Sequence, residues 1–178
     1  MAAQRALDFP AIWQDAIPYD RFIAEAQDLQ KLWEGIYRRF QVPAWARERA
    51  REVSGIRFLC ITEDWCWDAA NVVPPIAKLC DESGTMELRI IKRDEQPEIM
   101  DRYLTNGSRS IPIVVALDSE FHESGRWGPR PRELQAWALA HKDELPKKEF
   151  YTTMRRWHVE DAGMSTLREV MEMVEPRQ

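Results

Sequence analysis

Apolar side chains recur at helical spacing in the first part of the chain. Between residues 19 and 40 they follow alternating intervals of four and three, which gathers them on one face of a helix: Phe22, Ala26, Leu29, Trp33, Ile36 and Phe40. Pro43 suits the first position of a second helix, expected to run to about Val53. Residues 1–53 are therefore predicted to form an N-terminal helical extension.

The pattern changes at Gly55, where short apolar runs replace the helical stripe. Ile56–Ile61 has the length and composition of a strand, and a helical stretch follows from about Cys66 to Asp81. Further strands are expected over 87–92, 111–117 and 121–126, and further helices over 97–104 and 131–141.

This order of elements predicts an α/β fold. A helical crossover joins the first two strands and favours parallel pairing, whereas the short connection between the last two favours a hairpin. We expect a central domain over 54–142, with a mixed sheet of about four strands flanked by helices. Residues 143–178 are helical in composition and are predicted to form a C-terminal helical extension.

Length and charge restrict the possible partners. The 178 residues suffice for one domain with a sizeable core, and no apolar run approaches the roughly 20 residues of a membrane helix. The net charge of −5 disfavours nucleic acid and anionic membranes, because both favour a basic surface. The first nine residues lack the apolar segment of a signal peptide, and three cysteines are too few for a disulfide framework. We therefore expect a cytoplasmic protein; the sequence does not indicate its oligomeric state.

Metal and cofactor chemistry has no support in the sequence. His122, His141 and His158 are scattered, and together with the cysteines they do not show the spacing of metal ligands. No glycine-rich loop suited to a phosphate is present. We predict neither a metal nor a cofactor.

Cys66 stands where a strand turns into a helix. A thiol at a helix N-terminus faces unpaired backbone N–H groups and the positive end of the helix dipole, which favour the thiolate. Glu63, Asp64 and Asp68 oppose this effect, because nearby negative charge disfavours a second anion. We expect an exposed, substrate-facing cysteine here; the alternative is a small buried apolar residue.

The residues around Cys66 resemble the active site of thioredoxins, where Trp precedes Cys-x-x-Cys at the start of a helix. The matching segment is Trp65-Cys66-Trp67-Asp68-Ala69, and Pro74 stands eight residues after the cysteine, as in thioredoxins. Ile111-Pro112 fits the position of the thioredoxin cis-proline, and Trp127-Gly128 fits a pair that lines the substrate groove. The resemblance covers roughly residues 54 to 142. With Arg93-Asp94 and the segments 104–107 and 127–131, it looks most similar to a bacterial thioredoxin-like family with helical extensions.

Two departures from the thioredoxin pattern limit what the resemblance implies. The second cysteine is replaced by Ala69, so Cys66 can form a mixed disulfide but lacks the usual thiol that resolves it. The buried acid of thioredoxins is replaced by Cys60, which is either a core residue or a displaced resolving thiol. Cys80 is expected to be a packing residue.

The resemblance implies a set of site residues. They are the catalytic Cys66, the possible resolving thiol Cys60, and the substrate-binding residues Trp65, Trp67, Asp68, Ile111, Pro112, Trp127, Gly128 and Arg130. Arg130 could offer a bidentate fork to a carboxylate of a glutathione-like thiol, or the segment 127–131 could be only a turn. Pro112 is expected to follow a cis bond, the alternative being a trans proline that opens an edge strand.

Two functions remain open. The first is a thioredoxin-like monothiol protein in which Cys66 forms mixed disulfides with a protein or low-molecular-weight thiol. The second is a redox-inactive module that holds an extended peptide or protein in a groove of Trp65, Trp67, Pro112 and Trp127. A peroxiredoxin-type peroxidase would place Thr three residues before its cysteine, whereas Thr62 stands four before Cys66.

Overall fold

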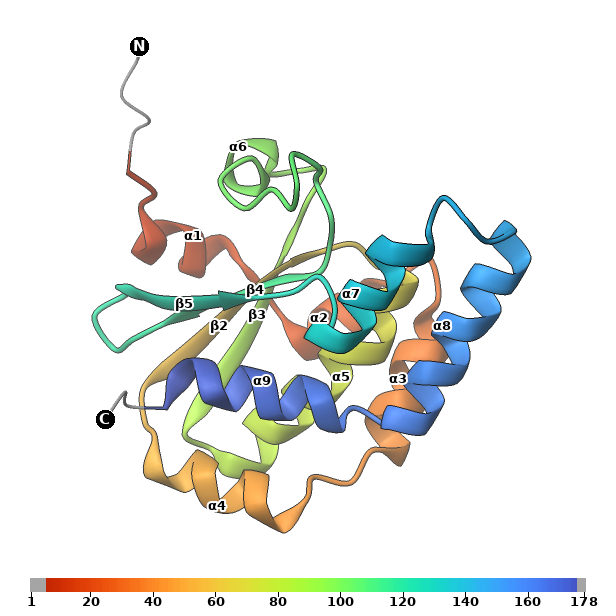
Figure 1. Cartoon of the computed structure of the whole chain (residues 1–178). Helices are drawn as coiled ribbons and strands as arrows, with labels where there is room; N and C mark the ends of the chain where they lie inside the picture. Colours follow the sequence, from red (N-terminus) through yellow and green to blue (C-terminus); the bar gives the residue numbers. More distant parts are fainter. Residues whose placement is uncertain (1–5, 176–178) are drawn as a thin grey trace.

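The computed structural model describes residues 6–175 and contains a five-stranded mixed sheet (Figure 1). The strand order is β1-β3-β2-β4-β5, with bounds β1 Ile17–Pro18, β2 Ile56–Thr62, β3 Met86–Lys92, β4 Ile113–Leu117 and β5 Glu123–Trp127. β2 and β3 pair in parallel, and β4 pairs antiparallel with both β2 and β5. The predicted α/β fold with a mixed sheet is confirmed, including the parallel crossover and the final hairpin.

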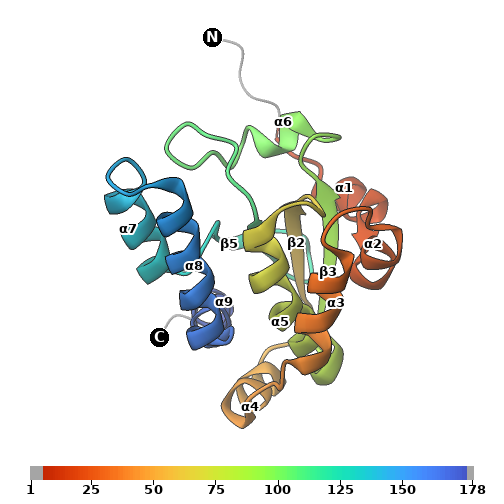
Figure 2. The ribbon, with the colours of Figure 1, turned by 90° about the vertical axis from the view of Figure 1, so that its right-hand side faces the viewer.

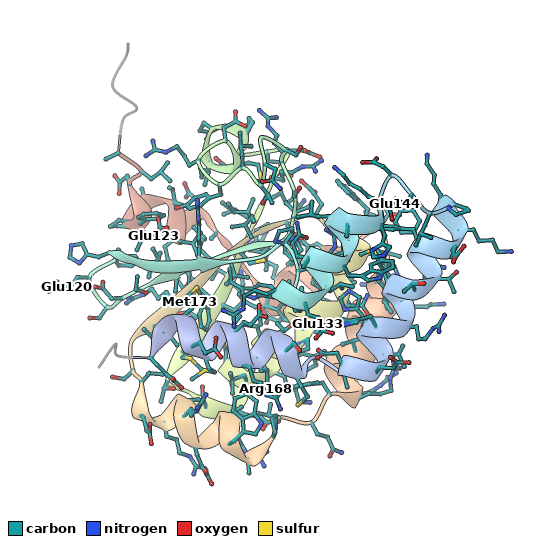
Figure 3. All side chains as sticks on the ribbon, in the orientation of Figure 1. Glu120, Glu123, Glu133, Glu144, Arg168 and Met173 are labelled. Atoms are coloured by element: carbon teal, nitrogen blue, oxygen red, sulfur yellow. The ribbon has the colours of Figure 1, made fainter. Side chains whose placement is uncertain are left out.

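Helices cover both faces of the sheet. α5 (Trp67–Ser83) and α9 (Met164–Val174) lie on one face, and α1 (Phe9–Asp15) lies on the other (Figures 1 and 2). The strands alternate accordingly, so that Phe58 and its partner Ala116 share the α9 face with Gly125. A Cβ at Gly125 would lie 2.6 Å from Cγ of Met173, which Figure 3 labels on α9, so α9 packs directly against the β5 backbone.

The N-terminal part differs from the single long helix expected over 19–40. It forms α2 (Tyr19–Glu25) and α3 (Gln30–Arg39), followed by α4 (Ala44–Glu52). The chain breaks because the backbone N–H groups of Gln27 and Asp28 donate to the Asp64 carboxylate, at 2.7 and 3.2 Å. Leu29 then takes a left-handed conformation, with φ of 51°. Both helices still bury apolar side chains, with Phe22 and Trp33 in edge-to-face contact.

β1 has no counterpart in the sequence-based prediction. It is only two residues long and pairs antiparallel with β3, Ile17 opposite Ile90 and Pro18 opposite Arg89. A segment of this length carries no detectable alternation of apolar and polar positions.

Other element boundaries shift by a few residues. α6 (Pro97–Met100) is shorter than the helix expected over 97–104. β4 begins at Ile113, after the Ile111–Pro112 peptide bond, which is cis. β5 covers 123–127 in place of 121–126, because Phe121 has a φ of 65° and lies in the turn that precedes the strand.

The C-terminal part contributes a helical hairpin beside the sheet. α7 (Arg132–His141) and α8 (Lys147–Asp161) are joined by a short turn, and Trp137 stacks on Phe150 with ring centroids 5.3 Å apart. Figure 2 shows α5 flanked by α3 and by α8. Within residues 6–175, no helix combines the length and apolarity that crossing a membrane requires.

Candidate functional site

Cys66 is the N-cap residue of α5 and lies beside the segment that precedes β4. Its Sγ accepts a hydrogen bond from the Ala69 backbone N–H at 3.4 Å, and it donates to the Ile111 carbonyl oxygen at 3.5 Å. The strand-to-helix turn therefore places the thiol as the sequence indicates. The expected exposure is wrong, however, because only 7% of Cys66 is accessible to solvent.

The surroundings of Cys66 favour the protonated thiol. Burial raises the pKa of Cys66 to about 11, and the nearby Asp68 carboxylate also raises it. The Ala69 N–H and the Arg130 guanidinium lower this pKa, but by less than burial raises it. From the sequence, the net effect of the helix N-terminus and the nearby acids on the Cys66 pKa is open. In the structure, burial makes the largest contribution to this pKa.

Of the three acidic residues near Cys66, Asp68 is the one that acts on the thiol. The Glu63 carboxylate accepts a hydrogen bond from the Asp94 N–H at 2.8 Å, and Asp64 accepts from the α2–α3 connection. Asp68 lies in the first turn of α5, with only 14% of its side chain exposed.

Asp68 faces two cationic or potentially cationic groups. Arg130 Nη2 lies 2.7 Å from Asp68 Oδ2, and His158 Nε2 lies 3.5 Å from Oδ1. Burial raises the pKa of Asp68, but the facing imidazole and guanidinium together lower it more, so the net shift is downward. Arg130 also donates to Gln135 Oε1 at 2.9 Å. The fork expected to bind a substrate carboxylate is thus occupied by a carboxylate of the protein itself.

Three buried polar atoms of this cluster make no hydrogen bond within the part of the chain that the structure describes. They are Asp68 Oδ1, Arg130 Nε and His158 Nε2. His158 is the most buried of the three side chains, with 5% exposed. His158 belongs to α8, so its contact with Asp68 connects the C-terminal helical hairpin to the first turn of α5.

A cavity of about 360 Å³ borders Cys66. Trp65, Trp67, Asp68 and Arg130 line it on one side, and α8 supplies Tyr151, Met154 and Arg155 on the other. Sequence reasoning missed these α8 residues. Their signal is the spacing 151, 154, 155 and 158, which places Tyr151, Met154, Arg155 and His158 on one face of a helix.

The remaining predicted residues are Pro112, Gly128, Trp127 and Trp65, and they lie in different surroundings. Gly128 contacts Pro112, because a Cβ on Gly128 would lie 2.2 Å from the Pro112 carbonyl oxygen. Trp127 turns away toward α9, is 8% exposed, and donates its indole N–H to Glu169 at 2.7 Å. Trp65, by contrast, is 45% exposed, with the Arg93 guanidinium 4.9 Å from its ring centre.

The other cysteines are inside the protein. Cys60 lies on β2 between Ile90 of β3 and Val114 of β4, and it is fully buried. Burial raises the pKa of both Cys60 and Cys80. All three cysteines are free thiols. Among residues 6–175, no three His, Cys, Asp or Glu side chains gather as metal ligands would.

A parallel β-α-β unit followed by an antiparallel hairpin, with a cysteine at the helix N-terminus, defines a thioredoxin-like protein. A family model described as Thioredoxin matches residues 16–153, and the chain belongs to this family. The match includes α2 to α4 and the first part of α8, so it extends beyond the segment whose motifs carry the resemblance. A search of curated proteins finds no significant match.

Two solved structures share the whole fold. One is an HIV epitope scaffold, with a TM-score of 0.77 and 16% identity, covering 97% of this chain and 100% of its own. The other is the protein of unknown function PA1234 from Pseudomonas aeruginosa, with a TM-score of 0.75 and 18% identity, covering 95% and 98%. At this level of identity, both similarities concern the fold alone.

Proposed function

We propose that this chain is a monothiol thioredoxin-like protein that forms mixed disulfides through Cys66. One observation carries the proposal: Cys66 lies at the N-terminus of α5, beside the Ile111 carbonyl, and borders a cavity. Family membership supports this assignment. The position of a second active-site thiol is held by Ala69, which is fully buried in the same turn.

The chemistry is a balanced thiol–disulfide exchange in two steps. The Cys66 thiolate attacks one sulfur of a substrate disulfide, a new S–S bond forms, and the other sulfur leaves as a thiolate that takes up a proton. An external thiol, from a protein or a small molecule, then loses its proton and attacks the substrate sulfur of the mixed disulfide. A disulfide forms between the external thiol and that substrate sulfur, the bond to Cys66 breaks, and Cys66 leaves as a thiolate that takes up the proton.

The raised pKa sets the resting reactivity of this site. Because its pKa is raised to about 11, Cys66 is almost entirely in the thiol form at pH 7. Exchange is therefore slow in the resting protein. A partner that draws α8 or Asp68 away from Cys66 would raise the thiolate fraction, because burial and Asp68 are what disfavour it.

A redox-inactive binding module is the second candidate, and the burial of Cys66 favours it. In this alternative the exposed Trp65 ring, stacked with Arg93, contacts a peptide or protein partner. Trp127 is unsuitable for such a contact because its ring is buried against α9. The two functions differ in whether the sulfur itself is needed.

Incubation with oxidised glutathione distinguishes the two functions. After incubation at pH 9, intact mass spectrometry should reveal one glutathionyl group per chain, and peptide mapping should place it on Cys66. Cys66→Ser should abolish this adduct, and Trp65→Ala should leave it in place. A folded protein that gains no adduct at Cys66, while the urea-unfolded chain does, would exclude the monothiol function and leave the binding module.

A further inference from the structure

A second cavity of about 510 Å³ lies between α3, α5 and α8, next to the site of Cys66. Figure 2 shows these three helices, with α5 in the middle. The volume falls within the range of about 300–1,000 Å³ that is usual for small-molecule sites. Trp67 and Arg155 line both this cavity and the one at Cys66, so the two are neighbours.

The walls of this cavity are mainly apolar. α3 and its C-cap residue contribute three half-buried side chains at intervals of four, α5 contributes two and α8 one: Leu32, Ile36, Phe40, Trp67, Pro75 and Val159. Val159 is 79% exposed at the surface of α8. When a hydrocarbon group displaces water from an apolar lining of this kind, the free energy of the system falls, which favours binding.

The charged residues of the cavity are all basic. Arg39 and Arg155 line it, and no acidic residue does. Neither guanidinium has a carboxylate within ion-pair distance in the described part of the chain; Arg155 lies 5.6 Å from the Trp67 ring centre. This contrasts with the net charge of −5 for the whole chain, so the uncompensated positive charge is local.

The imidazole of His158 also lines the cavity. Its Nε2 is buried and lies 3.5 Å from Asp68 Oδ1, so this atom faces a carboxylate of the protein and not the cleft. The polar recognition of a ligand in the cleft therefore rests on the two arginines.

We propose that the cleft of α3, α5 and α8 binds an amphipathic anion: a single hydrocarbon chain with a carboxylate head of the fatty-acid type. The apolar side chains of α3 and Val159 enclose the hydrocarbon chain, and Arg39 and Arg155 supply the opposite charge to the head group. An inorganic anion would leave the apolar walls wet, and an uncharged hydrocarbon would leave both guanidinium groups unpaired. The inference does not depend on the chemistry of Cys66.

Decanoate is a suitable probe for the full-length chain. Isothermal titration calorimetry at neutral pH, below the micellar concentration, should give one bound decanoate per chain. Decanol should bind at least about tenfold more weakly, since it lacks the charge, and acetate should not bind measurably. Equal affinity for decanoate and decanol, or no binding of decanoate, would overturn the proposal.

Variants locate the bound ligand. Val159→Glu adds a negative charge at an exposed position of the cleft and should abolish decanoate binding without affecting folding. The double variant Arg39→Gln, Arg155→Gln should reduce the affinity at least tenfold. Arg38→Gln is the matched control, because Arg38 lies on the same helix but lines a different cavity. Binding that survives Val159→Glu would place the ligand elsewhere and refute the assignment.

The test also separates this site from the proposed function. Cys66→Ser should bind decanoate as the natural chain does, because the sulfur does not line this cleft. Conversely, Val159→Glu should still gain the glutathionyl adduct at Cys66. Loss of decanoate binding in Cys66→Ser would show that the ligand occupies the Cys66 cavity and not the cleft.

Discussion

The Arg130 guanidinium lies 2.7 Å from the Asp68 carboxylate and joins the segment after β5 to the first turn of α5. Both side chains are mostly buried, with 23% and 14% of their surfaces exposed. The pair therefore influences both the stability of the fold and the ionisation of Cys66, which lies two residues before Asp68.

Loss of the Arg130 partner should destabilise the protein. Arg130→Gln leaves a mostly buried carboxylate without its guanidinium, and we expect a cost of about 2–3 kcal/mol in the free energy of unfolding. This is less than the 3–5 kcal/mol typical of fully buried pairs, because some solvent reaches the site. Urea unfolding measures the effect. Arg132→Gln should change stability little, since the Arg132 side chain is 74% exposed.

The same comparison has a defined pH dependence. The pKa of Asp68 is lower in the folded protein than in the unfolded chain, so its pairing stabilises the fold above the unfolded value of about 3.9. That contribution is lost as pH falls through the folded pKa. The stability difference between the natural chain and Arg130→Gln should narrow on acidification. A difference that grows at low pH would contradict the assigned ion pair.

Asp68 should also control the reactivity of Cys66. Asp68→Asn removes the negative charge that raises the Cys66 pKa, and we expect several-fold faster alkylation by iodoacetamide at pH 8. Peptide mapping assigns the label to Cys66. Glu120→Gln is the control, because Figure 3 shows Glu120 at the tip of the β4–β5 hairpin. Equal rates for Asp68→Asn and the natural chain would argue against this coupling.

The raised Cys66 pKa predicts an unusual pH profile for the folded protein. The alkylation rate of Cys66 should keep rising with a midpoint near pH 11, whereas in urea the midpoint should lie near the ordinary value of about 8.5. At pH 8 the unfolded chain should react roughly a hundredfold faster, since its thiolate fraction is larger. A native midpoint below 8 would mean that the helix terminus outweighs burial.

Gly128 is required by its close approach to Pro112. Its φ is +115°, and a Cβ there would lie 2.2 Å from the backbone carbonyl oxygen of Pro112. Gly128→Ala should lower the free energy of unfolding by at least about 3 kcal/mol. Gly107 has a φ of +76°, but a Cβ there would meet no other atom within 4 Å. Backbone strain alone should therefore lower the free energy of unfolding of Gly107→Ala by about 1–2 kcal/mol. Similar costs in urea unfolding for both variants would show that the contact with Pro112 is unimportant.

A second thiol at position 69 should convert the site to a dithiol site. Ala69 lies in the same turn as Cys66, and its backbone N–H is 3.4 Å from Sγ. Ala69→Cys should raise turnover in insulin reduction driven by dithiothreitol, since the new thiol can release the mixed disulfide. Ala70→Cys, the adjacent buried position, should not. If the natural chain already turns over like a dithiol protein, Cys60 becomes the resolving thiol.

The sequence predicts the central strands and the position of Cys66 because these depend on local patterns. The apolar run of β2 ends in polar residues, and a helix begins directly after Cys66, so strand, turn and helix follow from neighbouring residues. The proximity of Pro112 and Gly128 was also predictable, because their two motifs stand at the spacing typical of the family that the sequence resembles.

The burial of Cys66 and the pairing of Arg130 depend on contacts between distant parts of the chain. α8 covers the thiol with residues more than 80 positions away, and periodicity does not reveal where a helix docks. The break between α2 and α3 has the same origin, because Asp64 captures the backbone of Gln27. An uninterrupted apolar stripe predicts one helix when such a competing acceptor is unknown.

The two-residue strand β1 has a protective consequence for the sheet. An unpaired outer strand can recruit another chain and seed aggregation, and short, proline-containing or charged margins counter this. Pro18 pairs opposite Arg89 and has no N–H to offer a further strand, while Arg89 and Glu87 form an ion pair on the same margin. A segment of only two residues thus covers the β3 edge of the sheet and protects it against pairing with another chain.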